Sequence, residues 1–260
     1  MENSFDGVAI DYDQSFTKSQ IGKFQREMVY SYVLNFIPRN TKLRILEINC
    51  GTGEDAIWFA EQGHEVLATD ISPVMLDMAK IKTDLKNLRF QQLDINDIDQ
   101  LSPEKKYDIL FSNFGGLNCL SPSELKQFYQ TSRKLLKDDG KMIHIIMSKC
   151  CIWDNIYLFF KGKWKSLFRR NTTNPVAVNI NGCSIRTWYY NPSDIVSYTR
   201  DVFNLEAYYP IGFCIPPSYL EHFFSKKKSV LLLLVWLDRH LQFSILSKYA
   251  DHFIISLKAK

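Results

Sequence analysis

Apolar positions in the first half of the chain recur in two alternating patterns, which predict helices and strands in turn. Residues 1–38 carry apolar side chains at helical spacing, and this pattern stops at Pro38. Short apolar runs then alternate with amphipathic stretches, as in a parallel sheet wound with helices on both faces. We predict strands at 43–48, 65–69, 88–93, 107–112 and 141–148, and helices at 54–62, 73–82 and 123–137, with caps at Gly63 and Gly140.

The pattern changes after residue 150. Residues 152–170 place aromatic and aliphatic side chains on one helical stripe, with most of the basic residues off it. Residues 176–190 predict a hairpin around Asn181-Gly182, a pair favoured in tight turns. We expect the remainder to form a helix at 192–201, a strand at 203–213, a long helix at 219–246 and a strand at 252–258.

These elements predict one α/β domain: a doubly wound, mostly parallel seven-stranded sheet with an antiparallel edge strand, plus a helix-hairpin lid insertion. The antiparallel strand is the last one, because it returns after a long helix. Within the single domain we expect an N-terminal helical cover (1–38), a cofactor-binding core (39–150), a lid or acceptor insertion (151–190) and a C-terminal part that completes the sheet (191–260).

The turn after the first predicted strand is the most informative segment. Gly51 and Gly53 lie between a strand and a helix, where the absence of Cβ atoms lets the backbone approach a ligand. Asp70 ends the second strand, where a carboxylate can accept ribose hydroxyls. Asp94 follows the third strand. We therefore expect a nucleoside ligand across the tips of the first three strands.

Two kinds of nucleoside cofactor fit this arrangement. Gly51-x-Gly53-x-x-Ala56 matches a dinucleotide-binding pattern, so a nicotinamide or flavin enzyme is an alternative. Against it, Glu47 lies inside the first strand, and the turn is followed by two acids, Glu54 and Asp55, which would repel a pyrophosphate. A cofactor with a cationic sulfur and a zwitterionic amino-acid end suits these acids better.

In these motifs the chain resembles the class I S-adenosylmethionine-dependent methyltransferases. Their first motif is similar to Glu47-Ile-Asn-Cys-Gly51-Thr-Gly53, with Asn49 where a glycine is usual; asparagine can adopt the left-handed conformation. The motif at the fourth strand of these enzymes is similar to residues 108–118 of this chain. The resemblance implies S-adenosylmethionine as the cofactor and implies these cofactor-binding residues: Tyr12, Glu47, Asn49, Gly51, Gly53, Asp70, Ile71, Asp94, Ile95 and Asn113.

The acceptor is expected beside the fourth-strand loop, where Asn113 and Asn118 can orient a polar group. His144 is the predicted base, although a satisfied core histidine fits its mid-strand position as well. The loop lacks the Asn-Pro-Pro-Tyr-like sequence of many nucleic-acid and protein methylators. Further candidates for acceptor contacts are Tyr12, Tyr189, Tyr190, Arg186 and His222.

Charge is unevenly distributed along the chain. Residues 1–150 hold 18 Lys or Arg and 21 Asp or Glu, whereas residues 151–260 hold 14 and 7. The basic, aromatic second part favours an anionic or amphiphilic partner. The aromatic stripe in 152–170 is interpreted either as lid packing or as an interfacial helix that contacts anionic membrane. Nucleic acid is disfavoured, because the basic residues accompany a hydrophobic helix rather than a stacking surface.

The remaining features concern metals and location. The six cysteines form no Cys-x-x-Cys pair and there is no histidine cluster, so no metal site is predicted and the thiols are expected to be free. The N-terminal residues do not have the pattern of a signal peptide. We therefore expect a cytoplasmic protein, with peripheral contact at the inner membrane surface as an option.

The function predicted from these observations is S-adenosylmethionine-dependent methyl transfer to a hydrophobic or amphiphilic small molecule. Oxygen is the expected acceptor atom, with nitrogen and carbon left open. The alternatives are a non-catalytic binding module with the same fold and a dinucleotide-dependent oxidoreductase.

Overall fold

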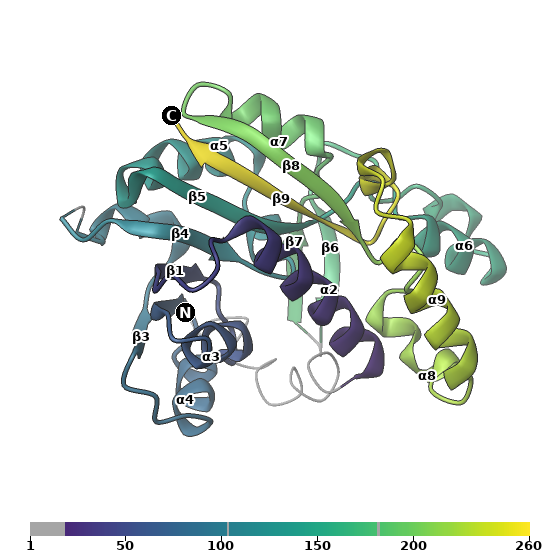
Figure 1. Cartoon of the computed structure of the whole chain (residues 1–260). Coiled ribbons are helices and arrows are strands. Elements are labelled where there is room, and N and C mark those ends of the chain that lie inside the picture. Colours follow the sequence, from purple (N-terminus) through teal and green to yellow (C-terminus); the bar gives the residue numbers. More distant parts are fainter. Residues whose placement is uncertain (1–18, 103, 181–182) are drawn as a thin grey trace.

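Seven strands form one sheet in the computed structural model, in the order β3-β2-β1-β4-β5-β9-β8 (Figure 1). The structure describes residues 19–102, 104–180 and 183–260. The strands of the sheet are β1 Arg44–Ile48, β2 Glu65–Asp70, β3 Leu88–Gln92, β4 Tyr107–Ser112, β5 Leu136–Met147, β8 Phe203–Ile211 and β9 His252–Ala259. Strands β6 Val176–Ile180 and β7 Cys183–Thr187 form a separate hairpin, as predicted.

The predicted fold class is confirmed, with one refinement at the sheet's far side. Strands β1 to β5 pair in parallel, and β9 pairs antiparallel with both β5 and β8. The antiparallel strand therefore lies one position in from the edge that we predicted for it. Burial explains this order, since β9 is buried along almost its whole length whereas β8 is exposed at several positions.

Helices cover both faces of the sheet. On one face, α2 Gln20–Phe36, α3 Glu54–Glu61, α4 Pro73–Ile81 and α9 Lys228–His240 contribute to one buried cluster. On the other face, α5 Pro122–Ser132 and α7 Pro192–Thr199 contribute to a second. Helices α6 Ile152–Phe160 and α8 Glu221–Phe224 lie with α9 at one end of the sheet (Figure 1). No described helix is long and apolar enough to cross a membrane.

Three predicted boundaries are wrong, each for a local reason. Gly140 lies inside β5 and caps no helix, because α5 ends at Ser132 and a short 3-10 turn leads directly into the strand. The predicted helix at 152–170 ends at Phe160, followed by Gly162 with φ +67°, a conformation that terminates helices. The long helix predicted at 219–246 is interrupted at 225–227, between α8 and α9, and α9 ends at His240.

Candidate functional site

The glycine turn after β1 has the tight geometry that the sequence predicts. Asn49, Gly51 and Gly53 all have positive φ, at 55°, 53° and 80°. A Cβ built on Gly53 would lie 2.8 Å from the Cβ of Ala79 in α4, so only glycine fits there without a shift. Asn49 adopts the left-handed conformation that we expected of it, and Gly116 of the fourth-strand loop packs directly against its side chain.

Asp70 holds this turn in place from the end of β2. Its Oδ2 accepts a hydrogen bond from the Gly51 amide at 2.8 Å, and its Oδ1 accepts one from the Ser72 amide at 2.9 Å. The carboxylate thus lies beside the turn, at the position predicted for a ribose-binding acid. Its contact with ribose stays a prediction, and the observed bonds show that it also shapes the loop.

Glu47 is the most unusual group in the site. Its side chain is almost completely buried, with 1% of the residue exposed, and Oε2 has no hydrogen-bond partner among the described residues. Burial raises the pKa of Glu47 well above its ordinary value, and Asp55 and Asp70 add to this while Arg26 opposes it. A buried carboxylate without a partner is costly, so this site is prepared for a cationic or hydrogen-bonding ligand.

Arg26 and Asp55 close one side of the same site, a role that no sequence motif indicates for either residue. The Arg26 guanidinium lies 2.7 Å from Asp55 Oδ1 and over the Phe114 ring, 5.2 Å from its centroid. Asn113 donates a hydrogen bond from Nδ2 to Asp55 Oδ2 at 3.1 Å. These residues and the glycine turn line a small pocket of about 30 Å³.

The remaining predicted cofactor residues lie at the tips of β2 and β3. Asp94 is half-buried, and its Oδ1 accepts hydrogen bonds from the amide and side chain of Asn96. Ile71 and Ile95 are also half-buried, and Gln92 donates to the Ile71 carbonyl at 3.0 Å. These groups line the same edge of the sheet as Asp70. Tyr12 lies outside the described residues.

Two of the three predicted catalytic residues are structural in this arrangement. Asn118 is fully buried: it donates to the carbonyls of Met147 and Trp188 and accepts from the Met147 amide. Its side chain therefore joins the fourth-strand loop to β5 and to the end of the hairpin. No polar atom of the Asn118 side chain is left to orient an acceptor, so we correct that prediction.

His144 is the second correction. It is fully buried in the middle of β5, beside the rings of Phe128 and Tyr129 in α5, and its Nδ1 lies 3.3 Å from the Tyr129 hydroxyl. Burial lowers the pKa of His144 to about 3. Its burial favours the alternative interpretation as a core histidine and keeps the ring away from any acceptor at the strand tips, although Nε2 has no hydrogen-bond partner among the described residues.

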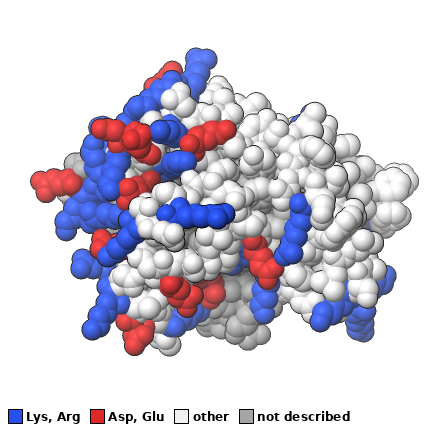
Figure 2. All heavy atoms as spheres, in the orientation of Figure 1, with Lys and Arg blue, Asp and Glu red and all other residues white. Residues whose placement is uncertain are grey.

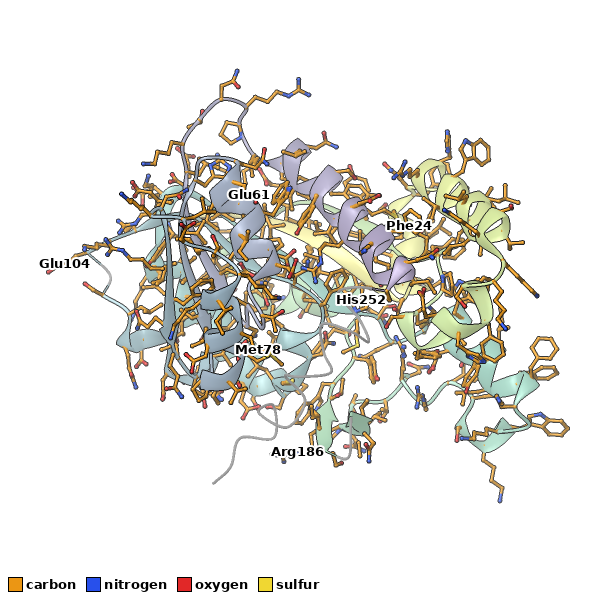
Figure 3. All side chains as sticks on the ribbon, turned by 90° about the horizontal axis from the view of Figure 1, so that it is seen from below. Phe24, Glu61, Met78, Glu104, Arg186 and His252 are labelled. Atoms are coloured by element: carbon orange, nitrogen blue, oxygen red, sulfur yellow. The ribbon has the colours of Figure 1, made fainter. Side chains whose placement is uncertain are left out.

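A different histidine lies at the tips of the strands. His252 begins β9 opposite Met147, and its ring packs edge-to-face on Phe114 with centroids 5.4 Å apart. Its Nδ1 lies 3.3 Å from Asp251 Oδ2. Figure 3 shows His252 near the centre of the molecule, whereas Arg186 of the hairpin lies at the periphery. The antiparallel return of β9 brings His252 here. The sequence pattern predicts this returning strand, but not its place beside β5, which is what positions His252 next to Phe114.

Asp251 connects His252 to a buried ionic network. The Arg170 guanidinium lies 3.0 Å from Asp251 Oδ1 and also contacts Asp154, which Arg169 binds with two nitrogens. Burial alone would raise the pKa of Asp251, but His252 and Arg170 hold it well below its ordinary value. The carboxylate is therefore ionised and places a negative charge beside the His252 ring.

The predicted lid is divided between two places. The hairpin remains attached to the strand tips, because Trp188 donates to the Asn118 carbonyl and Tyr190 pairs with Ser148. Helix α6 is fixed elsewhere, with Trp153 Nε1 donating to the Phe213 and Cys214 carbonyls, and most of its apolar stripe faces solvent. Lid packing therefore does not explain that stripe.

The other candidates for acceptor contacts are scattered. Tyr190 donates to the Leu120 carbonyl, Tyr189 is buried against Arg170, and Arg186 and His222 are exposed. Within the described part of the chain, no group of three His, Cys, Asp or Glu side chains could hold a metal ion. The five cysteines outside the hairpin are free thiols.

Comparisons with known proteins agree with this geometry. Residues 45–140 match the family described as a methyltransferase domain. A malonyl-[acyl-carrier protein] O-methyltransferase of Bacillus anthracis is 30% identical over 151 residues, which cover 55% of this chain and 51% of that protein. A tRNA 5-carboxymethoxyuridine methyltransferase of Escherichia coli (strain K12) is 27% identical over 89 residues, 34% of each chain. The chain thus spans about half, or less, of the length of these relatives.

A solved structure extends the similarity beyond the matched domain. The magnesium protoporphyrin IX methyltransferase of Synechocystis PCC 6803, crystallised with bound SAH, has a TM-score of 0.56 to this chain. The alignment covers all of this chain and 89% of that one, at 14% identity. At this identity the similarity establishes a shared fold.

Proposed function

We propose that this chain, which belongs to the class I S-adenosylmethionine-dependent methyltransferases, methylates an oxygen of a hydrophobic or amphiphilic small molecule. The predicted family, fold class and cofactor are confirmed by the matched domain and the shared fold. The acceptor and its atom are our proposal, and they rest on the residues at the strand tips.

The observation that carries the proposal is the acidic environment of the glycine turn. Glu47, Asp55 and Asp70 surround it, and the buried Oε2 of Glu47 has no described partner. S-adenosylmethionine, when bound, supplies a methyl group on a positively charged sulfur and an ammonium group. Ligand positive charge would offset the repulsion among these carboxylates, whereas a pyrophosphate would add to it. The residues present therefore fit the cofactor.

His252 supports oxygen as the acceptor atom. A hydroxyl must lose its proton during methyl transfer, and the imidazole of His252, whose Nδ1 lies 3.3 Å from Asp251 Oδ2, is a group that could accept that proton. The ionised Asp251 would then stabilise the imidazolium. We propose this role for His252 in place of His144. The similarity to a relative named as an O-methyltransferase supports the same atom.

Binding and turnover measurements test the proposed function. Calorimetric titration of the full chain should show binding of S-adenosylmethionine and none of NADH. Release of S-adenosylhomocysteine is then measured with long-chain hydroxy compounds, fatty acids, short polar alcohols and bulk tRNA. Turnover only with the long-chain acceptors is the expected result. Turnover with tRNA alone would overturn the acceptor class, and cofactor binding without any turnover would favour the non-catalytic alternative.

The role of His252 has its own test. His252→Gln should lower kcat on a hydroxyl acceptor by about 100-fold, with little effect on KM for the acceptor or on cofactor affinity. His222→Gln, on the exposed face of α8, is the matched control and should behave as wild type. An unchanged kcat in His252→Gln would show that His252 is not the base.

A further inference from the structure

The end of the molecule formed by α6, α8 and α9 exposes an unusual number of large apolar side chains. Phe160, the last residue of α6, is 81% exposed, and Trp164, beyond the end of α6, is 68% exposed. On α9, Leu233 is 56% and Trp236 is 54% exposed, and Ile245 in the following turn is 69% exposed. We call this region, residues 152–168 and 223–249, the apolar end.

The two parts of the apolar end are held against one segment of the chain. Trp153 of α6 donates to the carbonyls of Phe213 and Cys214, and Asp238 of α9 accepts from the amides of the same two residues. The Ile152 amide also donates to the Tyr249 carbonyl. Figure 1 shows α6, α8 and α9 at the same end of the sheet. The apolar end is therefore one structural unit rather than two separate patches.

Helix α9 is apolar around most of its circumference. Leu231 and Val235 are buried against the sheet, whereas Leu232, Leu233 and Trp236 face solvent. A surface helix of a water-soluble domain normally has a polar outer face, so the outer face of α9 is suited to a second apolar environment.

The exposed charges of the apolar end are of one sign. Its two acids, Asp154 and Asp238, are both buried. The exposed lysines in these ranges are Lys161, Lys163, Lys165, Lys226, Lys227, Lys228 and Lys248. Figure 2 shows that the right-hand part of this face carries few charges, whereas the left-hand part carries both signs.

We propose that the apolar end binds the surface of an anionic lipid bilayer. Exposed aromatic residues interleaved with lysines match what the interface requires: rings that enter the acyl boundary and ammonium groups that reach the phosphates. A second copy of the chain fits less well, because a symmetric contact would bring the same lysine clusters toward one another. Binding here would hold the strand tips near a membrane, from which an amphiphilic molecule could be taken.

Vesicle flotation with the full-length chain tests this inference without any measurement of activity. The vesicles are phosphatidylcholine alone, or phosphatidylcholine and phosphatidylserine in equal parts. The chain should float with the mixed vesicles and not with phosphatidylcholine alone, and high salt should release it. Replacing Lys161, Lys163 and Lys165 by Gln should weaken binding about tenfold or more.

Apolar variants separate insertion from simple charge attraction. Phe160→Ser with Trp164→Ser should lower the bound fraction at least tenfold, and Trp236→Ser alone should lower it by a smaller factor. The matched control is Ile81→Ser, because Ile81 is 86% exposed at the end of α4 and lies outside the apolar end. It should bind as wild type.

Several outcomes would overturn the inference. Equal flotation of wild type with both vesicle types would exclude anionic recognition, and no flotation with either would exclude bilayer binding. If light scattering showed a dimer in wild type that Phe160→Ser with Trp164→Ser converts to a monomer, and neither bound vesicles, the surface would be an interface between copies.

Discussion

Individual carboxylates at the glycine turn have different roles because their partners differ. Asp70 and Asp55 are engaged by backbone amides, Asn113 and Arg26, so they build the loop and its cover. Glu47 lies deeper, with an oxygen that no described group satisfies. Sites that bind a charged ligand often keep such an unfavourable group, since the ligand and not the protein completes its contacts.

Glu47→Gln tests this distinction. The pKa of Glu47 is raised in the fold, so its contribution to stability is present below the unfolded pKa and is lost as pH rises through the folded pKa. The neutral amide should therefore raise the melting temperature at pH 8. It should also weaken S-adenosylmethionine binding by about 1–3 kcal/mol in calorimetry.

The control for Glu47→Gln is Glu65→Gln, an exposed glutamate at the opposite end of the neighbouring strand that pairs with Lys42. Glu65→Gln should change neither the melting temperature nor the affinity for S-adenosylmethionine appreciably. A lower melting temperature in Glu47→Gln together with unchanged affinity would contradict the assignment of Glu47 to the cofactor site.

Elements meet at Asn118, which ties the fourth-strand loop to β5 and to the hairpin. Three backbone groups of Met147 and Trp188 depend on its side chain. Because these groups belong to separate elements, the side-chain amide of Asn118 satisfies buried backbone groups between elements, as a capping side chain does at the end of one helix. The hairpin is attached to the strand tips through this residue, while α6 is fixed to Phe213 and Cys214.

Asn118→Ala should therefore destabilise the fold by about 2–4 kcal/mol, because it leaves buried backbone groups without partners. Urea unfolding followed by circular dichroism gives this value. The control is Asn204→Ala, because Asn204 is an exposed asparagine on β8, and it should change the free energy of unfolding only slightly. If Asn118→Ala unfolded like wild type and lost only turnover, the side chain would act on the acceptor after all.

At the scale of the whole molecule, the sheet is covered by helices on both faces, so groups at its centre are shielded from solvent until the domain unfolds. His144 is such a group, and it couples global stability to pH. Its pKa is about 3 in the fold and ordinarily 6.5. A lowered folded pKa contributes stability that is present above pH 6.5 and is lost as pH falls toward 3.

This coupling predicts that protonation of His144 in the unfolded chain lowers the free energy of unfolding by about 2 kcal/mol at pH 5 relative to pH 7. In His144→Gln that component should be missing, so the difference in unfolding free energy between these two pH values should shrink by about that amount. Urea titrations at both pH values measure it. An identical pH dependence in wild type and variant would mean that His144 becomes protonated without unfolding.

The sequence by itself determined the order and kind of most elements, the glycine turn and the acids beside it. These follow from local spacing: apolar periodicity decides strand or helix, and a motif that joins consecutive strands and helices places its own residues at one edge of a parallel sheet. Asn49, Gly51, Gly53, Asp70 and Asp94 could be found in this way.

Only the tertiary structure decided which partner each side chain meets. Arg26 reaches Asp55 from another helix, His252 reaches Phe114 because β9 inserts between β5 and β8, and Asn118 and His144 are occupied by distant groups. Such contacts depend on how elements far apart in the chain pack together. Local pattern carries no information about that packing, so the acceptor side of the site could not be predicted from it.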